Sequence, residues 1–297
     1  MPSIFEQLLL GSFIINFVVY LYVTWITSRL FWHFVIRKKP NSAQTIPMLS
    51  MLVFSWLLCA IFGAALSLFN IIFWTPASYN NHSVMLAFFL PAILSVNCVH
   101  ISQFFITVER IIMMRAATNN HHKDLLTPCI FFNVTLALAL ALLFGFNFNP
   151  NDDDSIGGND QRMPILRLIN MNTYLISYYI ANGSSIATLL ASLYFLFLFR
   201  NNTKSNAGTP FTKMQNTIKY TICIDICLDF LPQISTIGFT LFGSPIGPYI
   251  AIVQRVLFTF CGIFINRKFY KVFVMKNNNS IADTSNVLQT VPAIVIQ

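Results

Sequence analysis

The hydrophobic residues of this chain lie in seven long blocks separated by shorter polar stretches. Each block is close to the ~20 apolar residues that a helix needs to cross a membrane. Apolar residues within a block are continuous instead of alternating with polar ones, which favours helices over a β-barrel. We therefore predict an all-α, polytopic membrane protein, a bundle of seven transmembrane helices. The predicted spans are Leu8–Ile26, Met48–Trp74, Met85–Val108, Leu125–Phe146, Tyr174–Phe199, Ile218–Leu241 and Tyr249–Ile265.

Two ends of these spans are open to more than one interpretation. Residues 29–35 are apolar enough to extend the first helix, and the last span reaches Asn266 or beyond if it is tilted. After it, apolar residues alternate with lysines, which is typical of a short amphipathic helix on the inner leaflet. We expect the bundle, with this helix, to occupy residues 1–276, and a flexible cytoplasmic tail to occupy 277–297. The alternating residues are Lys268, Phe269, Lys271, Val272, Phe273 and Lys276.

The composition supports a membrane protein. Charged residues make up 9% of the chain and hydrophobic residues 56%, whereas about 25% of the residues of a soluble domain are charged. So few charges could not cover a water-soluble domain of this size, which argues against a soluble enzyme and a disordered protein. The net charge of +8 is spread over short loops instead of one face, so we expect the lipid bilayer, and no nucleic acid, as a partner.

Lysine and arginine are distributed unequally between the two sides of the predicted bundle. Cytoplasmic loops carry an excess of these residues, so the richer side is expected to face the cytoplasm. The N-terminus is then outside and the C-terminal tail inside. The poorer side has only Arg162 and Arg167. The richer side has Arg29, Arg37, Lys38, Lys39, Arg110, Arg115, Lys123, Arg200, Lys204, Lys213, Lys219, Arg267, Lys268, Lys271 and Lys276.

Three charged residues lie deep inside predicted spans. Asp225 and Asp229 are four residues apart in the sixth span and share a helix face, and Arg255 lies in the seventh. A charge at this depth costs about 2.5–3.5 kcal/mol, so each needs a partner or water. Asp229 is about 15 Å from Lys219 and Arg255 about 18 Å from Arg267 along their helices, so we predict that the two pair. The pair is either a structural lock, a conformational switch or part of a ligand pocket, while Asp225 meets a polar cavity or Lys219.

Catalytic and metal-binding arrangements are missing from the sequence pattern. Of the histidines, only His100 is deep in a predicted span, and no His/Asp cluster or Ser-His arrangement accompanies it. The cysteines lie inside apolar blocks without a Cys-x-x-Cys spacing. We therefore expect no enzyme, no cofactor and no metal. His100, Asn97 and Gln103 are interpreted as a hydrogen-bonded set in helix packing.

Short motifs at the inner ends of the spans suggest a signalling role. Glu109-Arg110 ends the third span, where an intrahelical ion pair could hold the arginine until it is released, although a charge pair that caps the span is an alternative. Pro232 follows Leu228-Asp229-Phe230-Leu231 in the sixth span and permits a hinge. Asn266 and Tyr270 have the spacing of the Asn-Pro-x-x-Tyr receptor motif, with Arg267 in place of proline.

The layout and these motifs, together with Gly247-Pro248-Tyr249 before the seventh span, resemble the nematode serpentine chemoreceptors, most closely class bc. The resemblance implies a G-protein-coupled chemosensory receptor that detects a small molecule, an odorant or pheromone, and signals to a heterotrimeric G protein. It also implies the plasma membrane of sensory-neuron cilia. The second span has no acidic residue and the loop between spans four and five has no cysteine, so two features of rhodopsin-like receptors are missing.

A ligand pocket is expected in the outer half of the bundle, between spans three, five, six and seven. Its predicted polar contributors are Tyr174, Tyr178, Gln233 and Gln254. Glu109, Arg110, Asp225, Asp229, Pro232, Arg255, Asn266 and Tyr270 are the predicted switch residues. The alternative function is a transporter or channel that uses Asp225, Asp229 and Arg255.

Overall fold

The computed structural model describes residues 4–36, 47–73, 82–115, 125–147, 171–202, 219–242 and 246–275. All regular secondary structure in these ranges is helical. Seven helices are long and apolar enough to cross a membrane, which confirms the seven predicted spans. The α-helices are α1 (Ile4–Phe31), α2 (Pro47–Ile72), α3 (His82–Arg115), α4 (Leu126–Phe146), α6 (Met171–Asn202), α8 (Leu231–Leu241) and α9 (Gly247–Tyr270), and the π-helices are η1 (Trp32–Ile36), η5 (Ile226–Phe230) and η6 (Lys271–Met275).

Two helices are longer than their apolar blocks. Residues 29–35 extend the first helix, because α1 continues directly into η1. The seventh helix continues from α9 into η6, and the N–H of Lys271 donates to the carbonyls of Arg267 and Lys268. The residues predicted to form a short amphipathic helix are helical up to Met275 and continuous with α9, and the place of this helix on the inner leaflet stays a prediction. The predicted tail at 277–297 lies outside the described residues.

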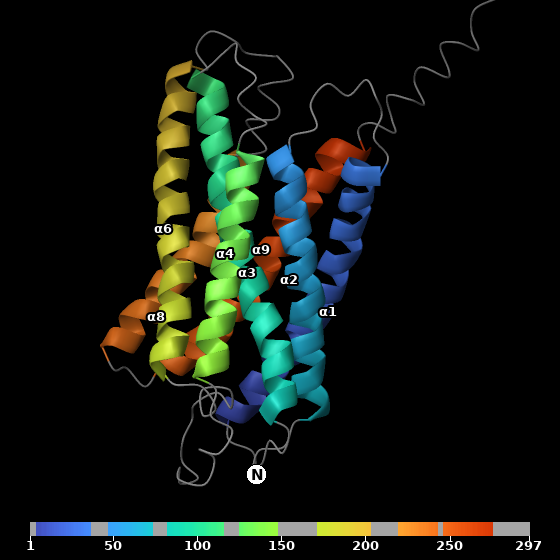
Figure 1. Ribbon diagram of the computed structural model, residues 1–297, viewed down its shortest axis with the longest axis vertical. Helices are drawn as coiled ribbons and strands as arrows, with labels where there is room; N and C mark the ends of the chain where they lie inside the picture. Colours follow the sequence, from blue (N-terminus) through green and yellow to red (C-terminus); the bar gives the residue numbers. More distant parts are fainter. Residues whose placement is uncertain are drawn as a thin grey trace, which may run out of the picture.

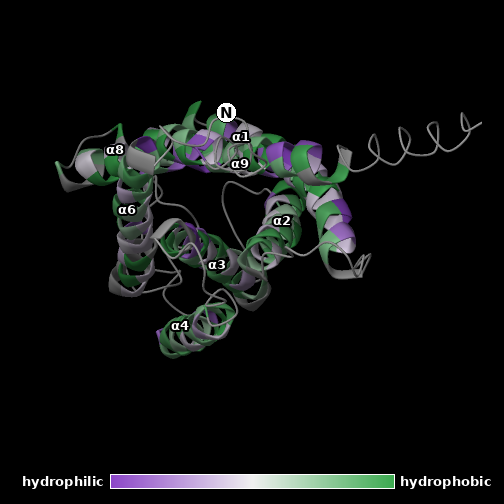
Figure 2. Ribbon diagram, turned by 90° about the horizontal axis from the view of Figure 1, so that it is seen from above, coloured by the Kyte–Doolittle hydropathy of each residue, from purple (hydrophilic) through white to green (hydrophobic). Residues whose placement is uncertain are grey.

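Neighbouring helices alternate in direction, so α1, α3, α6 and α9 end on the same side of the bundle (Figure 1). We call this side the basic end, because an arginine lies near the end of each of these helices. They are Arg29, Arg110, Arg200 and Arg267. In the view from above, α4 lies at the rim next to α3, while α1 and α9 lie side by side (Figure 2). The sixth span therefore runs away from the basic end, between α6 and α9.

The main core joins α1, α2, α3 and α9 through aromatic rings that fill the space above two glycines. A Cβ atom at Gly262 of α9 would lie 2.7 Å from the ring of Trp56 on α2. A Cβ atom at Gly63 of α2 would lie 2.5 Å from the ring of Tyr20 on α1. Trp56 is fully buried and stacks on Phe258 of α9 with ring centroids 5.2 Å apart. The absent side chains thus allow three helices to approach closely.

The outer surface of the bundle is apolar. Large hydrophobic side chains such as Phe131 and Leu142 of α4 and Leu190 of α6 are more than half exposed. Broad exposed apolar surfaces are typical of contact with a membrane or a partner. In α4 most side chains of the span face outward, which agrees with its place at the rim of the bundle. The polar groups discussed below lie in the interior instead.

Candidate functional site

The sixth span is interrupted by one wide turn that carries Asp229. The span is α-helical over residues 219–225 and again from Leu231, with η5 between. The N–H of Leu231 donates to the carbonyl of Ile226, five residues earlier. Pro232 has no N–H, and in an α-helix its ring would clash with the carbonyl four residues before it. The residues just before Pro232 form a π-helical turn, a feature often found at functional sites, while the predicted hinge at Pro232 stays a prediction.

His100 of α3 connects this wide turn to α6. Its Nδ1 atom lies 3.4 Å from Oδ2 of Asp229 and 3.2 Å from Oγ of Ser185 on α6. The exposed fractions of His100 and Asp229 are 1% and 2%, so the contact is internal. A proton on Nδ1 can be donated toward both oxygens, whereas a bare Nδ1 would face the lone pairs of the carboxylate. The geometry thus favours the tautomer with its proton on Nδ1.

Asp225 makes a second link between the same two spans, one turn nearer the basic end. Its Oδ1 atom accepts a hydrogen bond of 3.1 Å from Nε2 of Gln103, and Sγ of Cys261 lies 3.9 Å away. His100 and Gln103 are three residues apart, so α3 presents both on one face. These residues form two hydrogen-bonded sets, and the charge of Asp225 interacts with His100 and Asp229 across them. We call the two sets together the polar network; it comprises His100, Ser185, Asp229 and Gln233 in the first set, and Gln103, Asp225 and Cys261 in the second.

The polar network contains two carboxylates and one imidazole. Within the described ranges, neither Asp225 nor Asp229 forms a salt bridge with a lysine or arginine. Two ionised carboxylates in a low-dielectric interior repel one another, so a proton on the imidazole or on one carboxyl group relieves the charge. In the same ranges no three His, Cys, Asp or Glu side chains come together as a metal site. The arrangement is chemically suited to holding a proton between spans three and six.

Arg255 is not part of the polar network, so the predicted Asp229–Arg255 ion pair is wrong. The carboxylate of Asp229 instead accepts from Gln233 at 2.9 Å and contacts His100. The guanidinium of Arg255 lies 5.5 Å from the ring centroid of Phe13 on α1. Rise along a helix gives the depth of a residue but not the direction in which its side chain points, and Arg255 points toward α1.

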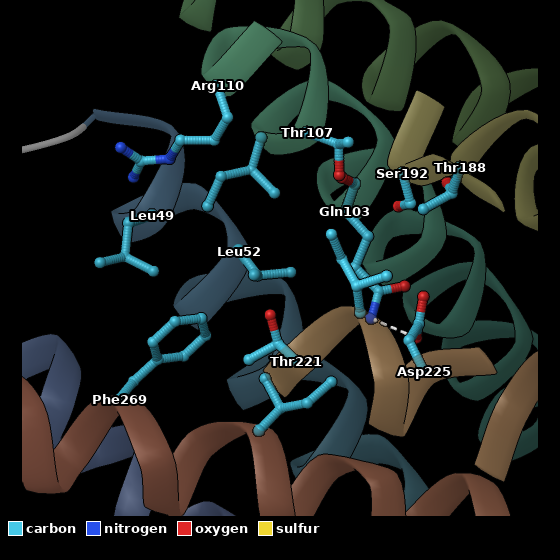
Figure 3. A pocket seen from close by; sticks show the side chains of 13 residues that line it. Leu49, Leu52, Gln103, Thr107, Arg110, Thr188, Ser192, Thr221, Asp225 and Phe269 are labelled. Carbon is cyan, nitrogen blue, oxygen red and sulfur yellow. Dashed lines mark hydrogen bonds between the residues drawn. The ribbon is translucent and has the colours of Figure 1, made fainter. Parts of the chain in front are cut away.

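A cavity of about 50 Å³ opens between α2, α3, α6, the sixth span and α9 toward the basic end. It could hold a few water molecules, since one needs roughly 10–15 Å³. Arg110 lies near Leu49 at one end of it, while Gln103 and Asp225, joined by their hydrogen bond, lie at the other (Figure 3). Thr107 lines the wall between them. Asp225 therefore lies beside a cavity lined by both apolar and polar side chains, and this cavity connects the polar network to Arg110.

Glu109 and Arg110 do not form the expected intrahelical ion pair. Glu109 is fully buried, and within the described ranges neither of its carboxylate oxygens has a hydrogen-bond partner. Consecutive residues of a helix point in different directions, so neighbours in sequence do not face each other. Arg110 lines the cavity and is 4% exposed. The two charges attract one another at the end of α3 without forming a direct ion pair.

Asn266 and Tyr270 also diverge. Asn266 is fully buried, and its Nδ2 atom donates to the carbonyl of Gly262 at 2.8 Å. The hydroxyl of Tyr270 accepts from Nη1 of Arg29 at 3.4 Å, next to α1. Neither residue contacts the polar network through a hydrogen bond within the described ranges. Their shared spacing therefore does not place them in one site.

The predicted ligand-binding residues are only partly described. Gln233 is 5% exposed and belongs to the polar network through Asp229, while its Oε1 atom has no hydrogen-bond partner within the described ranges. Gln254 is half-buried on α9, and its side chain makes no hydrogen bond in those ranges. Tyr174 and Tyr178 belong to α6, but their side chains lie outside the described part of the structure.

Sequence reasoning missed the role of His100 as the partner of Asp229. The depth of His100 in the membrane could have indicated this contact. His100 is ten residues from Arg110 and so about 15 Å from the basic end, which is the same depth as that calculated for Asp229. Ser185 and Cys261 had no such signal, since serine and cysteine are common in helix packing. His100 and Gln103 make hydrogen bonds between helices, as expected, but Asn97, the third member of the predicted set, donates only to the carbonyl of Ile93 in its own helix.

Comparison with known proteins does not identify a family. No protein-family model matches the chain, and no curated protein is significantly similar to it. The function is therefore inferred from the geometry of the described residues.

Proposed function

We propose that the chain is a G-protein-coupled chemosensory receptor of the serpentine type, with its N-terminus outside the cell and its basic end in the cytoplasm. It detects a small molecule and signals to a heterotrimeric G protein at the plasma membrane, in the cilia of sensory neurons. The excess of Lys and Arg on one side supports this orientation. The motifs that resemble class bc receptors support the family.

One observation carries the proposal: the cavity that joins Arg110 to the polar network. Arg110 lies at the side of the cavity nearer the basic end, and Gln103 and Asp225 lie deeper in the bundle. A change in the contacts of Asp229 or Gln233 would alter the position of the sixth span, which forms one wall of the cavity. A ligand in the opposite half of the bundle could in this way change what the cytoplasmic side presents to a G protein.

The ligand site is proposed in the half of the bundle away from the basic end, between α3, α6, α8 and α9. Gln233 is its inner boundary, since it contacts Asp229 and its Oε1 atom has no hydrogen-bond partner among the described residues. Tyr174, Tyr178 and Gln254 are the other proposed contributors. A small odorant or pheromone with a hydrogen-bond donor would suit the oxygen of Gln233.

A transporter or channel is the second candidate, because two carboxylates lie inside the bundle and one of them, Asp225, lines a cavity. Ion pathways in membranes are often marked by such residues. Against it, Arg255, which this function was expected to use with Asp225 and Asp229, points toward α1. The receptor is therefore the better supported of the two.

The two candidates are separated by one pair of experiments on the full chain. Cells that carry a promiscuous G protein are screened with small volatile and pheromone-like molecules, with calcium as the readout. A receptor gives responses that disappear without the G protein. Purified protein in liposomes is then tested for solute uptake and current with the same molecules. Uptake or current without a G protein would establish the transporter or channel and refute the receptor.

A further inference from the structure

A groove lies between the ends of α1 and α9 at the basic end. It has a volume of about 530 Å³. Trp25, Ser28, Arg29, Trp32 and His33 line it from the first helix, and Tyr270 and Val274 line it from the seventh. None of these residues belongs to the polar network or to the cavity that holds Arg110. We call this feature the α1–α9 groove.

Arg29 is held in position against the aromatic wall of the groove. Its guanidinium carbon lies 4.5 Å from the ring centroid of Trp25, and Nη1 donates to the hydroxyl of Tyr270. The rings of Trp25 and Tyr270 are 6.4 Å apart. A guanidinium has five N–H donors, and within the described ranges the others of Arg29 have no partner. An exposed cation with fixed geometry and open donors is suited to binding an oxyanion.

An exposed apolar strip on α1 leads to this groove. Val18, Leu21, Tyr22 and Trp25 are each at least 40% exposed, and their spacing of three or four residues places them on one helix face. The next residues at this spacing are the exposed Ser28 and Arg29. The face thus changes from apolar to polar within two turns, as the environment does between the acyl chains and the headgroups of a bilayer.

No described carboxylate opposes Arg29. The acidic residues in the described ranges are Glu6, at the other end of α1, and Glu109, Asp225 and Asp229, inside the bundle. Arg267 and Lys271 are exposed at the same end of the bundle as the groove. Basic pockets between helices at the cytoplasmic side bind the headgroups of anionic lipids, so the charge of this region fits such a ligand.

We propose that the α1–α9 groove binds one anionic phospholipid of the cytoplasmic leaflet. Its phosphate contacts Arg29, Ser28 and Tyr270, and an acyl chain lies along the strip formed by Val18, Leu21, Tyr22 and Trp25. The strip favours a lipid over a free phosphate, because a free phosphate gains nothing from apolar contacts. This inference does not depend on the ligand or the G protein of the proposed receptor.

The test uses the full chain in phosphatidylcholine nanodiscs and the fluorescence of its tryptophans. Trp25 and Trp32 line the groove, Trp56 is buried in the core, and the fourth tryptophan, Trp74, lies outside the described residues. A doxyl-labelled phosphatidylserine is expected to quench the fluorescence at about a fivefold lower mole fraction than doxyl-labelled phosphatidylcholine, the ratio that one basic residue near a membrane provides. Equal quenching by the two lipids would overturn the proposal.

Single substitutions test whether the preference for phosphatidylserine arises at the α1–α9 groove. Arg29→Gln should remove the preference for phosphatidylserine and Tyr270→Phe should reduce it. The matched control Arg267→Gln, at the same end but outside the groove, should leave it unchanged. A loss in Arg267→Gln as large as in Arg29→Gln would mean attraction by the whole surface and would refute the site.

Two further arms keep the test decisive if Arg29→Gln does not fold. In the Trp25→Phe, Trp32→Phe double variant, which keeps Arg29, the selective quenching should disappear; its persistence would place the lipid elsewhere and overturn the proposal. Millimolar inorganic phosphate should not abolish the preference of the unmodified protein. If it does, the groove is a site for free anions and the lipid assignment is wrong.

Discussion

His100 Nδ1 and Asp229 Oδ2 lie 3.4 Å apart in the interior of the bundle, and this contact joins spans three and six. Hydrogen bonds to charged groups contribute about 1.5–3 kcal/mol, and loss of one partner leaves the other buried without it. His100→Leu and Asp229→Asn should each lower the apparent melting temperature in detergent. The double variant should lose less than the sum of the two, since the contact can be lost only once.

The control for this double-mutant cycle is Asp229 and Arg255, the predicted pair that is not in contact in the structure. Asp229→Asn combined with Arg255→Gln should give additive losses, because Arg255 lies over Phe13. Additive losses for His100 and Asp229, with coupling between Asp229 and Arg255, would contradict the geometry of the polar network.

Gly262→Ala should destabilise the bundle. The new Cβ atom would lie 2.7 Å from the ring of Trp56, which is fully buried and stacked on Phe258. Overpacking of this kind costs about 1–3 kcal/mol. Gly145→Ala and Gly238→Ala are matched controls, since nothing lies within 4 Å of a Cβ atom at either position. In detergent, the melting temperature of Gly262→Ala should be well below that of both controls. Equal melting temperatures would show that α2 and α9 can move apart without loss of stability.

The seven spans were predictable because length and hydropathy alone decide whether a helix can cross a membrane. The position of the break in the sixth span was also predictable, since Pro232 lacks an N–H wherever the helix points. The hydropathy of a span and the missing N–H of a proline are each set by the local sequence and not by contacts with other helices. The seven spans and the irregular turn before Pro232 are present in the structure.

The contacts between spans were less predictable. Depth placed Asp229 near both His100 and Arg255, but the rotation of each helix about its axis decides which of them it meets. That rotation depends on packing, for example of Trp56 against Gly262, and on the wide turn at η5. The Glu109-Arg110 motif failed as an ion pair because adjacent residues on a helix diverge.

The topology has a direct test. The excess of Lys and Arg on one side predicts that an epitope at Met1 is accessible on intact cells and that one at Gln297 is not. Both tags are stained before and after permeabilisation, so each tagged protein is its own control. Staining of a Gln297 tag on intact cells would show that the bundle has the opposite orientation in the membrane. It would refute the proposed coupling to a cytoplasmic G protein.

Arg110→Ala should abolish G-protein activation while surface expression and ligand affinity stay nearly unchanged. Arg110 lines the cavity at the basic end, about 15 Å along α3 from His100. The control is Arg267→Ala, an exposed residue at the same end that does not line the cavity. Nucleotide exchange in membranes and ligand binding are measured on the same preparations. An equal loss of binding in Arg110→Ala would mark Arg110 as a residue required for folding.

Pro232→Ala should uncouple Asp229 from His100. Alanine restores an N–H that can donate to the carbonyl of Leu228, so the wide turn at η5 is no longer required. If the turn became α-helical, its hydrogen bond would span four residues instead of five. The residues before η5 would then rotate by about 100° relative to α8, since an α-helix turns through 360° in 3.6 residues. Asp225 would then rotate away from Gln103, and Asp229 from His100.

Expression should persist in Pro232→Ala because alanine is the best helix former, but the agonist response should fall. The decisive measurement repeats the His100 and Asp229 cycle in this background, where His100→Leu and Asp229→Asn should no longer be coupled. Pro91→Ala is the matched control, because α3 stays α-helical through Pro91. Full coupling between His100 and Asp229 in Pro232→Ala would mean that their contact, and not the proline, holds the wide turn open.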